Sequence, residues 1–187
     1  MPPFAPVTLT TDRLALRFFD EGDAAALYAI FSDPAVTRYW SSPAWADMEQ
    51  AHDSIKEAMV AYADGSGLRL GIVLHATGEL IGYINLYAIY HANRRCDIGY
   101  ALAQAHWGKG YLAEAMQAML EHAFGPMDLN RIEADIDPRN TASEKLLERM
   151  GFQKEGYMRE RWIVNGEVCD TAFYGLLRSE WQSIDTH

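Results

Sequence analysis

Two glycines and a lysine precede a helical pattern in the stretch HWGKGYLAEAM, residues 106–116. Backbone N–H groups at a helix N-terminus lack helical partners, and the helix dipole there favours a bound anion. Gly108 and Gly110 would let a phosphate approach without meeting a Cβ, and Lys109 would add a positive charge. The alternative is a turn whose glycines only permit positive φ between a strand and a helix. The stretch lacks the P-loop ending and the third glycine of a dinucleotide fingerprint, so a phosphate here would belong to another cofactor class.

Composition and charge limit the classes of protein to which the chain can belong. Its 187 residues, of which 49% are apolar, suit a single globular domain with a sizeable core. The net charge of −10 opposes binding to nucleic acid or to an anionic membrane, and it is compatible with a cationic partner such as an amine. No apolar run approaches the roughly 18 residues of a membrane span, and the N-terminus lacks the pattern of a secretion signal.

The cysteines and histidines indicate neither a disulfide scaffold nor a metal centre. Cys96 and Cys169 are too few for a disulfide framework in a chain of this length, which predicts two reduced thiols in a cytoplasmic protein. Four histidines show no metal-ligand spacing, so we expect no metal. They are His75, His91, His106 and His122.

Hydrophobic periodicity predicts one mixed α/β domain over residues 8–181, with a largely antiparallel sheet. The predicted strands are residues 7–19, 68–76, 79–89, 94–103, 130–137, 152–164 and 167–177. The predicted helices follow Asp20 or Asp23, Asp47, Gly110 and the capping residue Asn140. Asn165 and Gly166 predict a tight hairpin turn between the last two strands. Met59 and Trp162 are expected to face the core.

Several motifs in order carry a resemblance to a known family. The stretches CDIGYALAQAHWGKGYLAEAM, NRIEADIDPRNTASEKLLERMGF and NGEVCDTAFYGLLRSEW resemble the GNAT superfamily of acetyl-coenzyme A-dependent N-acetyltransferases. The early stretches TDRLALRFF and SDPAVTRYW are similar to its branch of ribosomal-protein N-terminal acetyltransferases. The resemblance implies a sheet of about seven strands with helices on both faces, splayed between the fourth and fifth strands. The pantetheine arm of the cofactor would lie in this V.

The resemblance also implies which residues bind acetyl-coenzyme A. The backbone of residues 107–112 would hold the pyrophosphate, with Leu112 as a departure from the family's glycine or alanine. A backbone N–H on the splayed strand would polarise the thioester carbonyl, and Asn140 would bind the pantetheine arm. The full set implied for the cofactor is Ile98, Gly99, Tyr100, Trp107, Gly108, Lys109, Gly110, Tyr111, Leu112, Asn140, Ser143 and Lys145.

Acetyl transfer to an amine requires that the amine first lose its proton, since alkyl amines are mostly protonated at neutral pH. The resemblance assigns this task to a carboxylate on the fourth strand, where this chain has Asp97, acting through a water. The alternative is that Asp97 pairs with Arg94 or Arg95, and Glu160 is a second candidate base.

The leaving thiolate requires a proton donor. The usual tyrosine of the family corresponds to Leu147 here, so that acid is missing, whereas the ribosomal-protein branch uses a serine that corresponds to Ser143. The resemblance therefore implies Asp97 and Ser143 as the catalytic pair.

The acceptor amine is the least determined part of the reaction. Tyr39 and Trp40 lie where relatives cover the acceptor, and Asn85 and Tyr87 alternate onto one face of a central strand. The resemblance favours a protein N-terminus, such as that of a ribosomal protein, bound by a monomer or homodimer. The alternatives are a small amine (a polyamine, amino sugar or antibiotic) or a weakly catalytic coenzyme A-binding module.

Overall fold

The computed structural model describes residues 3–181, which form one open sheet with helices on both faces. Within these residues the sheet has eight strands in the order β1-β2-β3-β4-β5-β6-β8-β7. Their bounds are β1 Thr8–Thr10, β2 Leu14–Arg17, β3 Leu68–Leu74, β4 Leu80–Tyr90, β5 Arg95–Leu102, β6 Arg131–Ile136, β7 Gln153–Val164 and β8 Glu167–Leu177. The α-helices are α1 Ala24–Phe31, α2 Glu49–Asp64, α3 Tyr111–Phe124 and α4 Thr141–Arg149.

The first predicted strand is two strands, which makes eight where the sequence predicted about seven. The chain reverses between β1 and β2, where the Thr11 N–H donates to the Leu14 carbonyl at 2.9 Å. The Leu14 N–H in turn donates to Thr11 Oγ1 at 3.0 Å. A turn closed by such local hydrogen bonds does not interrupt the alternation of apolar and polar residues, so the sequence pattern predicts one continuous strand.

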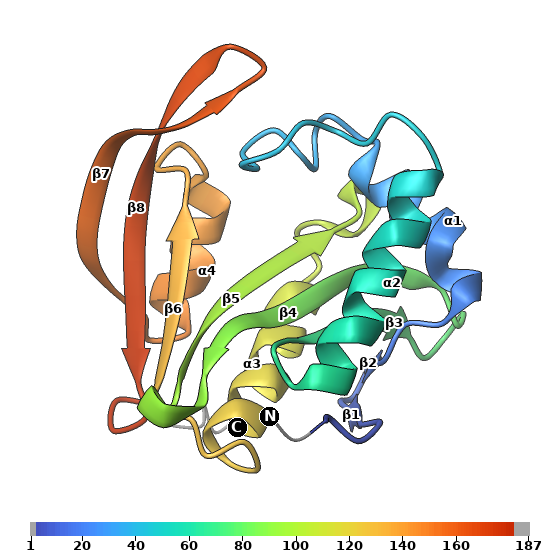
Figure 1. Cartoon of the computed structure of the whole chain (residues 1–187), viewed down its shortest axis with the longest axis horizontal. Helices are drawn as coiled ribbons and strands as arrows, with labels where there is room; N and C mark the ends of the chain where they lie inside the picture. The colour runs from blue at the N-terminus through green and yellow to red at the C-terminus, as the bar shows by residue number, and fades with distance from the viewer. Residues whose placement is uncertain (1–2, 182–187) are drawn as a thin grey trace.

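The predicted splay between the fourth and fifth strands is confirmed and lies between β5 and β6. These two strands run parallel, whereas every other neighbouring pair is antiparallel. They pair only at Arg95 with Arg131, Cys96 with Ile132, and Asp97 with Glu133. Beyond these pairs they diverge, and the two halves of the molecule form a V that opens toward the top of Figure 1.

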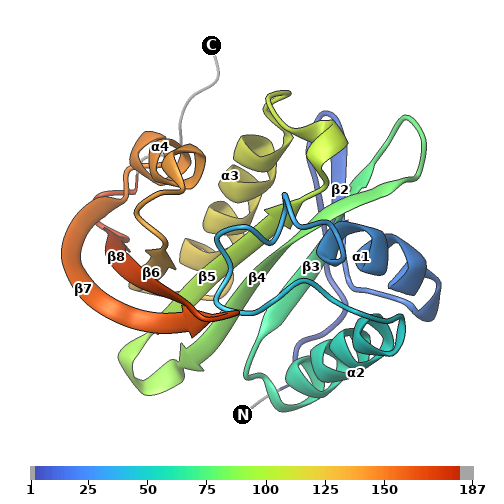
Figure 2. The ribbon, with the colours of Figure 1, turned by 90° about the horizontal axis from the view of Figure 1, so that it is seen from above.

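Helices cover both faces of the sheet, α1 and α2 on one and α3 and α4 on the other (Figure 2). Helix α3 presents Met116 and Met119, both fully buried, to the sheet. On α2, the expectation for Met59 is wrong, because this side chain is 41% exposed while Ile55 is buried. No helix among residues 3–181 is long and apolar enough to cross a membrane.

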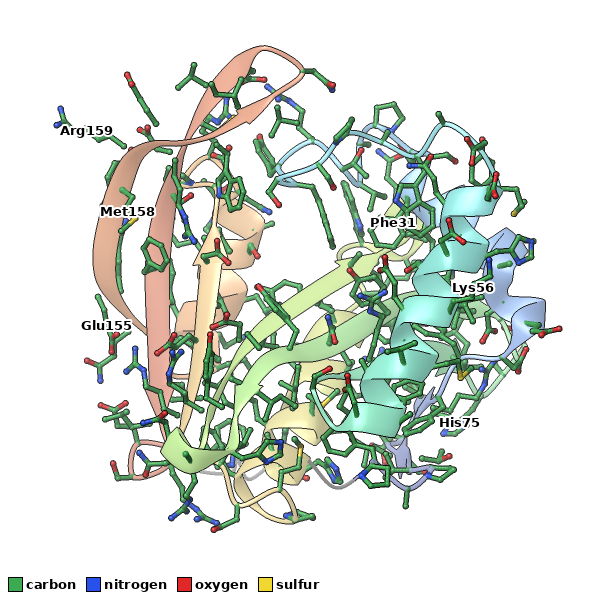
Figure 3. All side chains as sticks on the ribbon, viewed as in Figure 1. Phe31, Lys56, His75, Glu155, Met158 and Arg159 are labelled. Atoms are coloured by element: carbon green, nitrogen blue, oxygen red, sulfur yellow. The ribbon has the colours of Figure 1, made fainter. Side chains whose placement is uncertain are left out.

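The final hairpin forms the outer edge of the sheet. Asn165 and Gly166 have φ values of 51° and 82°, which is the predicted tight primed turn. The pairing of β7 with β8 is irregular between Met158 and Trp162, and β7 bends there. Figure 3 shows Met158 and Arg159 on the outer side of this curved strand. The irregular, charged edge is unsuited to pairing with another strand.

The close contact of β4 with β5 at Gly82 predicts that a larger residue there destabilises the fold. A Cβ at Gly82 would collide with the carbonyl oxygen of Ala101 and lie 3.1 Å from the Leu102 Cα. Because both obstacles are backbone atoms, we expect Gly82→Ala to lower the free energy of unfolding by about 1–3 kcal/mol in urea denaturation. Gly156→Ala is the control, since its nearest neighbour would be 3.8 Å away. Equal stability of the two variants would contradict this packing.

Candidate active site

A cavity of about 160 Å³ lies where β5 and β6 part. We call it the fork cavity. Its walls come from the loop after α1, strands β4, β5 and β6, the start of α4, and the β7–β8 hairpin. Eight residues singled out from the sequence line it: Tyr39, Trp40, Tyr87, Ile98, Gly99, Tyr100, Asn140 and Ser143. The chain thus brings together side chains more than 100 positions apart.

The remaining predicted residues lie outside the walls of this cavity. Asp97 sits at the last paired position of β5, two residues below Gly99 on the same face. Asn85 lines a different cavity beside α2, and Lys145 is exposed on α4. Residues 107–112 precede and begin α3.

Two hydroxyl groups form one wall of the fork cavity. The Tyr100 hydroxyl and Ser143 Oγ are 2.7 Å apart, and the Ser143 N–H donates to the capping Asn140 Oδ1 at 3.2 Å. Burial raises the pKa of Tyr100 to about 12, so the phenol stays protonated at neutral pH. Leu147 is fully buried in the core. The hydroxyl pair is therefore a protonated hydrogen-bond donor on this wall of the fork cavity, whereas Leu147 offers no polar group.

The Tyr100 hydroxyl was not anticipated from the sequence, which singled out only the backbone near this residue. The clue was present in the strand alternation, because Tyr100 lies two residues from Ile98 and so shares its face of the sheet.

Carboxylates gather on the opposite face of the same strands. Asp97 and Glu133 are register partners, and Asp135 follows two residues later on the same face of β6. Burial, and next the charges of Glu133 and Asp135, raise the pKa of Asp97 to about 6. Arg95 pairs with Glu133 at 3.0 Å and Arg94 pairs with Asp128 at 2.9 Å. Both arginines therefore bind other carboxylates, which leaves Asp97 poised to titrate.

Asp135 is an acidic residue of the fork cavity that sequence reasoning missed. The Tyr87 hydroxyl donates to its Oδ1 at 3.5 Å, and Arg161 Nη1 lies 3.1 Å from its Oδ2. Asp135 lies two residues after Glu133 in the predicted strand at residues 130–137, so strand alternation could have placed both carboxylates on one face of the sheet.

Ion pairs join three separate segments across the mouth of the fork cavity. Arg38, in the loop after α1, lies 3.2 Å from Glu167 at the tip of the hairpin. Arg139, before α4, binds Glu167 as well and donates from Nε to Asp137 at 2.9 Å. The loop and the hairpin tip approach each other at the top of Figure 1.

Trp162 of β7 lines the fork cavity and is 39% exposed, so its predicted place in the core is wrong. The physical reason is that β7 is the outermost strand and is covered on neither face at this point.

The glycine loop, residues 107–112, has the conformation that its glycines allow. Gly108 and Gly110 have φ values of 73° and 80°. A Cβ on Gly108 would touch nothing within 4 Å, so this glycine is required by its φ and not by space. The indole of Trp107 donates to the Leu102 carbonyl at 2.7 Å and holds the start of the loop. The arrangement leaves the N-terminus of α3 open to an anion.

Arg13 is a further residue at this loop that the sequence did not single out. Its Nη1 donates to the Lys109 carbonyl at 3.0 Å, and its Nε lies 2.7 Å from Glu114 Oε2 in the first turn of α3. Arg13 thus fixes the loop against α3, with its charge balanced by that of Glu114.

Comparison with known proteins identifies this arrangement. The family model described as an acetyltransferase (GNAT) domain matches residues 13–153. The chain belongs to the GNAT family of acetyltransferases. It is an acetyl-coenzyme A-dependent N-acetyltransferase, as its sequence resemblance predicted.

Three GNAT relatives illustrate the extent of the similarity. The uncharacterized N-acetyltransferase p20 of Bacillus licheniformis is 39% identical over 93% of this chain and 98% of its own length. The [ribosomal protein uS5]-alanine N-acetyltransferase of Escherichia coli is 28% identical over 94% of this chain and 93% of its own. The structure of Mycobacterium smegmatis RimJ in complex with CoA-disulfide superposes with a TM-score of 0.85 at 26% identity, covering 98% of this chain and 93% of that one.

The raised pKa of Asp97 predicts how ionisation affects stability. Because its pKa is about 6 in the fold and 3.8 without the fold, the native state binds the proton more tightly. The contribution of Asp97 to stability therefore falls as pH rises from about 4 to 6. We expect Asp97→Asn to be more stable than the natural protein at pH 8, with a smaller difference at pH 4.5.

Carbon-detected NMR tests the same point directly. The Asp97 carboxyl resonance, assigned by its loss in Asp97→Asn, should titrate near pH 6. A midpoint near 4 would show that the carboxylate is well solvated or paired.

Proposed function

We propose that this GNAT enzyme transfers the acetyl group of acetyl-coenzyme A to the N-terminal amine of a protein. The observation that carries the proposal is the two-sided fork cavity, with a hydroxyl pair on one wall and carboxylates on the other. The similarity over 94% of the chain to an enzyme named as a [ribosomal protein uS5]-alanine N-acetyltransferase supports a protein acceptor.

Acetyl-coenzyme A would bind along the divergence of the two strands. The glycine loop, which Arg13 holds in place, offers N–H groups and the charge of Lys109 for the pyrophosphate. Beyond Asp97, the edge of β5 that faced β6 has lost its strand partner, so backbone groups there are available to the pantetheine arm. Asn140 and Ser143 face the same space from α4.

The acceptor side of the reaction begins with a proton transfer. The cationic amine enters a cavity whose wall carries the Asp135 carboxylate. A proton then passes from the amine through a water to Asp97. A pKa near 6 leaves Asp97 ionised at neutral pH and able to take that proton. The freed nitrogen lone pair then attacks the thioester carbonyl carbon.

Attack forms the C–N bond and moves the carbonyl electrons onto oxygen. A backbone N–H at residues 98–100 donates to this oxyanion, an interaction worth about 2.7–4 kcal/mol when the donor is pre-aimed. Collapse of the intermediate breaks the C–S bond, and the sulfur leaves with a proton supplied by the Ser143–Tyr100 hydroxyl pair. The remaining extra proton of the nitrogen passes through solvent to restore the hydroxyl pair, and Asp97 releases its proton to solvent, which gives the amide, coenzyme A and one proton.

A screen of acceptors with thiol release as the readout tests the proposed function. We expect a peptide with an N-terminal alanine to be acetylated with a kcat/KM at least about tenfold above those of spermidine and an amino sugar. Mass spectrometry should place the acetyl group on the terminal nitrogen. Faster acetylation of spermidine, or binding of acetyl-coenzyme A without transfer to any amine, would overturn the proposal.

The hydroxyl pair predicts a non-additive pair of variants. Ser143→Ala keeps the backbone N–H that Asn140 accepts, and Tyr100→Phe keeps the ring, so each removes one hydroxyl. We expect each to lower kcat by about 10²-fold and the double variant to lose little more, since the hydroxyls act together. Tyr28→Phe, which removes a hydroxyl bonded to the Ala46 carbonyl, is the control. Fully additive losses would assign the two hydroxyls to separate tasks.

A further inference from the structure

A second cavity, of about 420 Å³, lies between α2 and strands β3 and β4. We call it the α2 cavity. Its walls are the C-terminal half of α2, the turn at residues 66–67, Arg69 of β3, and Asn85 and residues 87–90 of β4. Tyr87 lines this cavity and the fork cavity as well, so one side chain lies against both.

Two polar side chains of the α2 cavity have hydrogen-bonding capacity that the fold does not use. Arg69 and Asn85 are register partners on adjacent strands, so they share a face of the sheet. Asn85 is only 9% exposed, and its side-chain amide forms no hydrogen bond with any of residues 3–181. The Asn85 amide is not sealed from solvent, so a ligand in the cavity can take the place of the water that it meets there.

Arg69 also has hydrogen-bonding capacity that the fold does not use. Its Nη1 donates to Ser54 Oγ of α2 at 2.7 Å, but its Nε is buried and has no partner within the described chain. No carboxylate of residues 3–181 forms an ion pair with it. The acidic side chain that lines the cavity, Glu57, is exposed at the rim. The inner part of the cavity therefore offers hydrogen-bond donors and a positive charge.

These properties select between classes of acceptor. A second ammonium group, as in a polyamine, would meet the Arg69 charge in this cavity. A peptide backbone supplies carbonyl oxygens for the donors and an N–H for the Asn85 carbonyl.

The backbone beside Tyr87 is strained as well. Ala88 has a φ of 47° at the point where the pairing of β4 with β5 becomes irregular. A non-glycine residue in this region of φ is uncommon and marks a position held by its surroundings. The surrounding structure therefore holds the backbone in place next to Tyr87, the residue that lines both cavities.

We propose that the α2 cavity binds the backbone of the acceptor polypeptide beyond its reacting amine. Arg69 and Asn85 donate to carbonyl oxygens of the first residues, while the terminal nitrogen passes Tyr87 into the fork cavity. This assignment rests on the proposed transfer to a protein N-terminus.

Calorimetric titration of the enzyme saturated with coenzyme A tests the assignment without catalysis. The probes are the C-terminally amidated tripeptide Ala-Ala-Ala and propylamine, which has an amine and no carbonyl group. We expect Asn85→Leu to weaken tripeptide binding about tenfold and to leave propylamine binding unchanged. Lys56→Gln, on α2 in Figure 3 and outside both cavities, should bind both probes as the natural protein does.

A second measurement does not depend on the folding of a variant. The side-chain amide signals of Asn85 in an NMR spectrum of the natural protein should shift when the tripeptide is added and stay in place with propylamine. Unmoved signals, absence of tripeptide binding, or an equal loss for both probes in Asn85→Leu would overturn the assignment. Failure of the proposed function is a separate result, because it would appear as bound peptide without acetyl transfer from acetyl-coenzyme A.

Discussion

Only three residue pairs hold β5 to β6, and the site depends on the pairing stopping after Asp97 and Glu133. A parallel pair with longer register would hydrogen-bond the two strands along their full length and close the space between them. Because the pairing ends early, backbone groups on the facing edges lose their partners while the helices behind each half keep the halves folded. A ligand that carries amide groups, as acetyl-coenzyme A does, is the natural replacement for the missing strand contacts.

The same divergence separates two kinds of chemistry. Side chains that alternate along β5 point to opposite faces, so Tyr100 meets Ser143 on the α4 side while Asp97 joins Glu133 on the other. Hydroxyls that stay protonated and the Asp97 carboxyl, whose pKa is raised to about 6, are thus held on opposite faces of one strand. Strand β5 thus carries the proposed base, Asp97, on one face and Tyr100 of the proposed proton-donating pair on the other.

The sequence predicted the local features of this arrangement well. The positive φ of Gly108 and Gly110, the Asn140 cap and the Asn165–Gly166 turn all follow from the conformations that single residues prefer. The position of the splay came from a resemblance and could not have been obtained from periodicity, since both strands alternate normally.

What the sequence did not predict depends on contacts between distant segments. Arg13 reaches Glu114 across about 100 positions, and no local pattern marks it. Trp162 is a large apolar side chain of the kind usually found in a core, and only its place on the outermost strand exposes it. Arg38 and Arg139, which form ion pairs across the mouth of the fork cavity, belong to no sequence pattern. Only the folded hairpin brings Glu167 between them. Exposed ion pairs of this kind each contribute only about 0–1 kcal/mol, whereas the core beneath is packed apolar surface. The polypeptide acceptor proposed above could therefore enter and leave by exchanging a few charged contacts for water, so repeated turnover would place no demand on the folded core.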